Sequence, residues 1–227
     1  MRSSTVVLGL AAFMTSAAAV PAATVAPLPL GKIGWHGAPV AGGPKVDVWG
    51  DSFEAIEAKI KAEYNPEFSI YLQEEQEAPG TSEDPAVAAR DQLERRARNR
   101  NCDKRFGEVV GVYAEQAINN LRRINGNSCK ARARHCVRTQ CVDGAAVGMC
   151  NDNYHDIDIP CTGVADFAAE IKRGCYRVEP QCDSYGNCVT SPWRSYTVGQ
   201  IFSDGLTWNV ILGDCTFFGS GTRPVKA

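Results

Sequence analysis

The sequence predicts an α+β fold in which an antiparallel sheet carries two helices on one face and disulfides staple the elements together. Three observations predict it: two segments with helical spacing of apolar residues, several short β-rich runs separated by turn signals, and an even number of cysteines. The 227 residues include ten cysteines, and all of them follow residue 101. We therefore expect a disulfide-rich α+β domain over residues 97–227.

The two helices are predicted from apolar residues that recur every three or four positions. The first covers residues 109–124 and ends at an Asn-Gly pair, which favours a helix C-terminus. The second covers residues 161–175, with Thr162 as its N-cap and Gly174 near its end. Because each helix has one apolar stripe, each needs a partner surface.

Short β-rich runs supply that surface. The predicted strands are residues 135–142, 145–150, 176–178, 188–196 and 206–212. Asp143-Gly144 is a strong two-residue hairpin signal, and a loop over residues 183–187 joins the second strand pair. The last run is mostly apolar, which suits a central strand.

The first 19 residues have the pattern of an export signal. Arg2 follows the initial Met, an apolar run covers residues 6–14, and Ala17-Ala18-Ala19 matches a signal peptidase site. We expect cleavage after Ala19, with Ala23 as the second choice. The alternative, a membrane anchor, needs a run of roughly 18 to 20 apolar residues. No transmembrane segment is therefore expected, and the protein is predicted to be secreted and extracellular.

The cysteines indicate the same compartment. They are Cys102, Cys129, Cys136, Cys141, Cys150, Cys161, Cys175, Cys182, Cys188 and Cys215. An even count behind an export signal predicts five disulfides, with their connectivity left open. A zinc site is the alternative, but the chain lacks the CxxC spacing of common zinc ligands. We expect no metal and no cofactor.

Residues 20–96 are predicted to be an acidic, cysteine-free pro-segment or linker. Residues 24–96 hold seven Lys and Arg against thirteen Asp and Glu, whereas residues 97–227 hold sixteen against thirteen. The pair Arg95-Arg96 resembles the dibasic site that kexin-type proteases of the fungal secretory route cut. Cleavage there would leave every cysteine on one fragment. The alternative is an uncut helix over residues 86–98.

Within this segment, one helix is predicted. Residues 24–50 are rich in Pro, Gly and Ala, which favours irregular chain. Asp51 or Ser52 caps a helix that runs to Tyr64. A short strand is expected over residues 68–72, before an acidic linker.

Several motifs of the cysteine domain resemble a group of small secreted fungal proteins. They are residues 136–141, 145–153, 161–166 with Cys175, 198–202 and 208–211. This pattern is similar to the killer-toxin KP4 and Ecp2-type effectors, in which a Cys-Asn-Asp element lies between two helices and a strand closes the fold. The resemblance implies fungal secretion and action as an effector or toxin on a host or a competitor. It assigns no active site.

A small secreted hydrolase of the nuclease kind is the alternative function. Such chemistry needs a general acid and base, and the cysteine domain offers only His155 and His135 as candidates. His155 lies in the polar run Asn151–Asp158, whose Asn and Asp residues also suit turns. No GxSxG motif is present. We assign no catalytic residue and favour a protein without enzyme activity.

Two groups of side chains are candidates for binding. The first could bind an anionic surface and consists of Arg122, Arg123, Lys130, Arg132, Arg134 and Arg138. The second could form a sugar-binding face and consists of Tyr185, Trp193, Tyr196 and Trp208. The small positive excess of the domain does not favour nucleic acid as a partner. We expect a monomer with an extracellular target, a protein, glycan or membrane surface.

Overall fold

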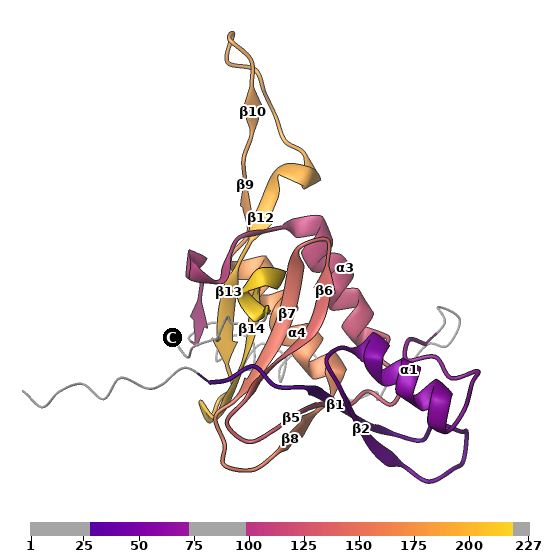
Figure 1. Cartoon of the computed structure of the whole chain (residues 1–227). Helices are drawn as coiled ribbons and strands as arrows, with labels where there is room; N and C mark the ends of the chain where they lie inside the picture. Colours follow the sequence, from indigo (N-terminus) through magenta and orange to yellow (C-terminus); the bar gives the residue numbers. More distant parts are fainter. Residues whose placement is uncertain (1–27, 73–98, 220–227) are drawn as a thin grey trace, which may run out of the picture.

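The computed structural model describes residues 28–72 and 99–219. Its helices are α1 (Phe53–Glu63), α3 (Gly111–Arg122) and α4 (Cys161–Gly174), arranged around antiparallel sheets (Figure 1). The predicted α+β class with a disulfide-stapled antiparallel sheet is confirmed. The predicted export signal (residues 1–19) and the Arg95-Arg96 pair lie outside the described residues.

A five-stranded antiparallel sheet forms the centre of the fold. Its strands, in spatial order, are β3 (Arg100–Asn101), β13 (Gly199–Phe202), β14 (Trp208–Asp214), β7 (Ala145–Asn151) and β6 (Cys136–Val142). The predicted central strand is β14, and the predicted hairpin is β6 and β7. Its turn has positive φ values of 45° at Asp143 and 87° at Gly144, as a primed hairpin turn requires.

Alternation along the strands places both predicted helices on one face of this sheet. Val210 and Leu212 of β14 join the core cluster that contains the apolar residues of α3 and α4, while Ile211 joins a second cluster. Phe218 covers this opposite face, where a side chain on Gly148 of β7 would lie 2.2 Å from the Phe218 ring. The period of two therefore separates a helix-covered face from one closed by aromatic residues.

A second sheet corrects the expectation of irregular chain over residues 24–50. Its strands, in order, are β2 (Val46–Gly50), β1 (Ile33–Gly37), β5 (Cys129–Ala131) and β8 (Ile157–Ile159). The first two strands pair over five residues each, and Gly34 of β1 pairs with Lys130 of β5. The glycines that suggested irregular chain permit this approach, since a side chain at Gly34 would lie 2.8 Å from Lys130 and from the Trp49 ring.

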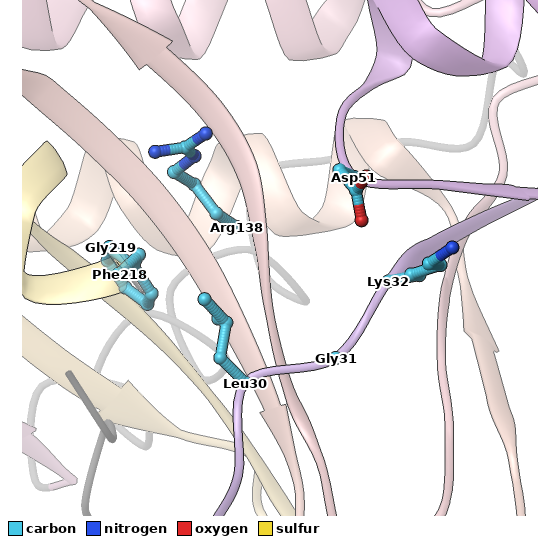
Figure 2. Close-up of a pocket in the computed structure, with 7 residues that line it drawn as sticks. All are labelled: Leu30, Gly31, Lys32, Asp51, Arg138, Phe218 and Gly219. Atoms are coloured by element: carbon cyan, nitrogen blue, oxygen red, sulfur yellow. The ribbon is translucent and has the colours of Figure 1, made fainter. Parts of the chain in front are cut away.

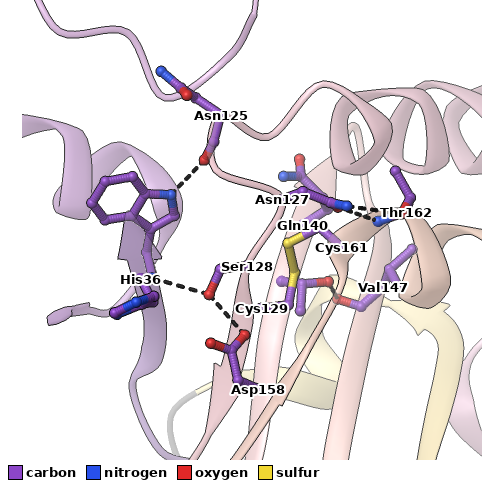
Figure 3. The surroundings of a disulfide bond; sticks show 12 residues. His36, Asn125, Asn127, Ser128, Cys129, Gln140, Val147, Asp158, Cys161 and Thr162 are labelled. Atoms are coloured by element: carbon purple, nitrogen blue, oxygen red, sulfur yellow. Dashed lines mark hydrogen bonds between the residues drawn. A yellow bond between two sulfur atoms is a disulfide. The ribbon is translucent and has the colours of Figure 1, made fainter. Parts of the chain in front are cut away.

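Two local predictions were wrong. Residues 68–72 do not form a strand, and they contribute only an isolated bridge between Tyr71 and Ile124. Thr162 is not the N-cap of α4, because the helix begins at Cys161 after Pro160. The side chain of Asn127 accepts a hydrogen bond from the Thr162 N–H at 2.9 Å (Figure 3). It thereby satisfies one of the N–H groups that have no partner within the first turn of the helix. The predicted cap of α1 is correct: Ser52 accepts from Ala55 N–H at 3.2 Å.

All ten cysteines form disulfides, as predicted, and the structure gives their connectivity. The pairs are Cys102–Cys175, Cys129–Cys161, Cys136–Cys150, Cys141–Cys215 and Cys182–Cys188. The first four link elements of the two sheets and α4, while the last closes only a local loop. Within the two described ranges, no helix has the length and apolar character needed to cross a membrane.

Candidate functional site

The basic side chains proposed for anion binding do not form one free surface. Five of the six have partners nearby: Arg122 with Asp166, Lys130 with Asp47, Arg132 with Asp156, Arg134 with Asp152, and Arg123 with the Leu72 carbonyl. Lys130 donates to Asp47 and lowers the pKa of that carboxyl, and the Ala133 N–H and then Arg132 lower the pKa of Asp156. These five cations are therefore paired with carboxylates or a backbone carbonyl of the protein itself, and they do not form a free site for an anionic ligand.

Arg138 is the sixth, and it lies beside a cavity. The cavity has a volume of about 350 Å³ and is lined by Leu30, Gly31, Lys32, Asp51, Arg138, Phe218 and Gly219 (Figure 2). A bulge in β6 between Arg138 and Gln140 shifts the register there. Figure 2 shows the ammonium of Lys32 pointing away from the Arg138 guanidinium. The two cations do not converge on one ligand position, and we assign no ligand to this cavity.

The two candidate catalytic histidines flank a buried asparagine. Asn151 donates its side-chain N–H groups to the carbonyls of Ala131, Arg132 and His155, and its Oδ1 accepts from the Asn153 N–H at 2.9 Å. His155 is exposed, and His135 places its Nδ1 2.8 Å from the Ala133 carbonyl. The polar run therefore shapes the loop, as the turn interpretation expected.

No catalytic constellation forms around these histidines in the described parts of the chain. There, neither imidazole ring makes a hydrogen bond or ion pair to a carboxylate. Across residues 28–72 and 99–219, no group of three His, Cys, Asp or Glu side chains is arranged to hold a metal ion. The hydrolase alternative therefore still has His135 and His155 as candidates, but in the described residues neither ring is hydrogen-bonded to a carboxylate that could orient it.

Residues 176–194 form an arm that is largely exposed to solvent. It contains β9 (Arg177–Val178), β10 (Gln181–Cys182) and β11 (Cys188–Val189), and it projects away from the sheets (Figure 1). Every residue from 181 to 190 is exposed, and Tyr185 at the tip is 90% exposed. Sequence reasoning predicted the loop over residues 183–187 and strands over residues 176–178 and 188–196. It missed β10 and the 3₁₀ turn at Pro192–Arg194, which interrupts the second predicted strand, and it did not predict that the loop would stand free of the body.

The tip of the arm is ordered by its own contacts. The Cys182–Cys188 disulfide closes the ladder of β10 and β11. Within the loop, the Asp183 carboxylate accepts hydrogen bonds from the N–H groups of Tyr185 and Asn187, both at 2.9 Å. The Asn187 side chain also donates to this carboxylate, and these bonds lower its pKa. The tip is thus held in one shape without support from the core.

The base of the arm is anchored to the body. β9 pairs with β12 (Ser195–Thr197), and β12 pairs on its other side with β4 (Val109–Val110). Trp193, in a 3₁₀ turn, is 59% exposed and packs its ring edge-on against Tyr113. Strand pairing and the Trp193–Tyr113 contact therefore fix the base of the arm to the body, while the tip stays exposed to solvent.

The four aromatic residues proposed as a sugar-binding face lie in different places. Tyr185 is at the tip and Trp193 at the base of the arm. The Tyr196 ring lies under the Arg177 guanidinium, and Trp208 packs against Phe167 of α4. Only the first two present large exposed surfaces, and both belong to the arm.

An ion pair at the arm's base predicts a pH dependence. Arg177 donates two hydrogen bonds to Glu108, at 2.5 and 2.8 Å, and this contact lowers the pKa of Glu108. A carboxyl with a lowered pKa contributes stability above its unfolded value of about 4.3 and loses it as the pH falls through the folded value. We expect the NMR signal of the Glu108 side-chain carboxyl carbon to titrate with a midpoint below about 4.3.

The control for this titration is Glu108→Gln, which cannot ionise. The titrating carboxyl signal should be absent from that variant, which assigns it to Glu108 and separates it from Glu179, the second carboxylate that pairs with Arg177. A midpoint at or above about 4.3 in the parent protein would show that the ion pair does not hold the base of the arm.

Together, the fold and the arm define a disulfide-stapled α+β protein with a projecting, self-ordered loop. No protein-family model, curated protein or solved structure matches the chain. Five disulfides fit a small cysteine-rich protein of an oxidising, extracellular compartment. Its function is therefore argued from the arm.

Proposed function

We propose that this chain is a secreted, cysteine-rich effector or toxin-like protein that acts outside the cell by binding a target on a host or a competitor. The observation that carries the proposal is the arm, whose tip is exposed throughout and ordered by a disulfide and the Asp183 carboxylate. A loop that is already ordered loses little conformational entropy on binding.

The chemistry of the arm supports recognition of a surface. One short segment carries three exposed apolar or aromatic side chains, Tyr185, Val189 and Trp193. None of them belongs to the hydrophobic core, and such exposed groups often mark a binding surface. Tyrosine and tryptophan combine large contact areas with few rotatable bonds, and they are frequent among the residues that dominate binding energies. The arm therefore has the composition of a binding loop.

The proposal predicts that the arm's tip dominates target binding. We expect labelled protein to bind saturably to at least one of a panel of intact plant, insect, yeast and bacterial cells. Tyr185→Ala should weaken that binding roughly 30-fold, as truncation of a dominant contact does. Its melting temperature should not change, because the ring is exposed. Cell-binding isotherms and thermal unfolding measure the two quantities.

Tyr154→Ala is the matched control, since Tyr154 is 88% exposed but lies outside the arm. It should bind as the parent protein does. Binding that is unsaturable on every cell type, or equal losses in Tyr185→Ala and Tyr154→Ala, would refute the proposal.

A further inference from the structure

The N-terminal segment, defined as residues 28–72, is built into the part of the chain that carries the cysteines, defined as the cysteine part, residues 99–219. We infer that a cut between the two leaves a two-chain protein whose short chain stays bound through non-covalent contacts alone. The inference concerns what the working molecule contains and is independent of the target that the arm binds.

Backbone hydrogen bonds fix both ends of the N-terminal segment. At its start, Gly31 N–H donates to the Cys136 carbonyl at 2.7 Å, and Cys136 N–H donates to the Pro29 carbonyl at 2.9 Å. At its end, Leu72 N–H donates to the Arg123 carbonyl and Asn125 N–H donates to the Ile70 carbonyl, both at 2.7 Å. Reciprocal pairs of this kind hold the segment in register at two separate places.

Between these ends, the segment contributes to the main core. Trp35 is fully buried, its indole N–H donates to the Asn125 carbonyl at 2.5 Å, and its ring packs edge-on against Phe68. The other buried apolar residues of the segment in the same cluster are Ile33, Val48, Phe53, Ile56, Ile60 and Ile70. They share that cluster with residues of α3, α4 and the central sheet. Removing the segment would expose this apolar surface to water.

Polar contacts complete the interface. Ser128 accepts from the His36 N–H at 3.0 Å and donates to Asp158, as Figure 3 shows. Lys130 forms an ion pair with Asp47 at 2.7 Å, and the Arg132 guanidinium lies 3.8 Å from the centre of the Trp49 ring.

A half-buried tyrosine links the segment to the central sheet. Tyr71 donates to Glu54 at 2.8 Å and accepts from the Gln140 side chain at 3.2 Å. Burial, and then Glu54, raise the pKa of Tyr71 well above its usual value, so that its hydroxyl keeps the proton. This hydroxyl is a specific contact across the proposed interface that a single substitution removes.

No disulfide joins the two parts, because every cysteine and all five disulfides belong to the cysteine part. Their covalent connection is the chain over residues 73–98, which includes the dibasic pair Arg95-Arg96. Cleavage at this pair would therefore break the covalent link between the two parts. The contacts described above would still hold the short chain in place.

The test is digestion of the purified protein with a kexin-type protease, followed by two separations. We expect two bands on a non-reducing denaturing gel, but a single species of combined mass by native mass spectrometry and size-exclusion chromatography at micromolar concentration. Arg95→Ala combined with Arg96→Ala provides the uncut control. If the protease leaves the parent intact, a variant with a site-specific protease site in place of residues 92–97 gives the same readout.

A pair of tyrosine variants tests the interface itself. In the cut protein, Tyr71→Phe should raise the dissociation constant of the two chains roughly 3- to 10-fold, the range of one lost hydrogen bond. Tyr64→Phe is the matched control, since the Tyr64 ring is exposed and should leave the constant unchanged. A short chain that elutes separately from the cysteine part would overturn the inference. Equal constants for both variants would overturn the interface described here, because the Tyr71–Gln140 contact would then contribute nothing to it.

Discussion

Removing the Cys141–Cys215 disulfide by double substitution to serine is expected to destabilise the protein by about 4 kcal/mol, the entropy of closing a loop of this length. The two residues are 74 positions apart, and they tie β6 to the chain just after β14. Cys141 is exposed and Cys215 half-buried, so the substitution removes little packing. Thermal unfolding should show a melting temperature lower by roughly 8 to 16 °C.

The Cys182–Cys188 disulfide provides the contrast. It spans only 6 positions and lies in the exposed arm, away from both core clusters. Its removal should leave the global melting temperature unchanged, because residues 181–190 are exposed and belong to neither core cluster. Amide exchange over residues 181–190 should become faster and target binding weaker. A similar loss of global stability for both disulfides would contradict this division between a stapled core and an autonomous arm.

The elements that sequence could predict are those defined by local patterns. The stripes of α1, α3 and α4, the Asp143-Gly144 turn and the apolar run of β14 each lie within a few residues of chain. Their signals need no knowledge of distant partners. The strands β1 and β2 differ in this respect, because glycines dilute their pattern and the second partner of β1 is β5, a strand far along the chain.

The candidate sites show the same limit. The basic residues are close in sequence, but the carboxylates that hold Arg122, Lys130 and Arg132 come from distant elements, among them Asp47 and Asp166. Composition alone could not show that these charges were already paired. The arm had a local signal, two cysteines 6 positions apart in a polar run, but its projection from the body depends on the anchoring of β9 to β12.

Trp35→Ala is expected to destabilise the intact protein by about 3 to 5 kcal/mol, as loss of a buried aromatic side chain does. Trp35 is fully buried, and its removal leaves a cavity beside Phe68 and takes the donor from the Asn125 carbonyl. Trp35→Phe separates the two effects, because it keeps a ring and loses the hydrogen bond. Trp193→Ala, which truncates a ring that is 59% exposed and removes its edge-on contact with Tyr113, should cost no more than about 1.5 kcal/mol.

Chemical denaturation of the four proteins measures these differences directly. The result bears on the N-terminal segment as a whole, since Trp35 lies outside the predicted cysteine domain. If that domain were stable alone, losing Trp35 would loosen the segment and leave the main unfolding transition in place. A single cooperative transition, shifted to lower denaturant in Trp35→Ala, would instead show that residues 28–72 and the cysteine part fold as one unit.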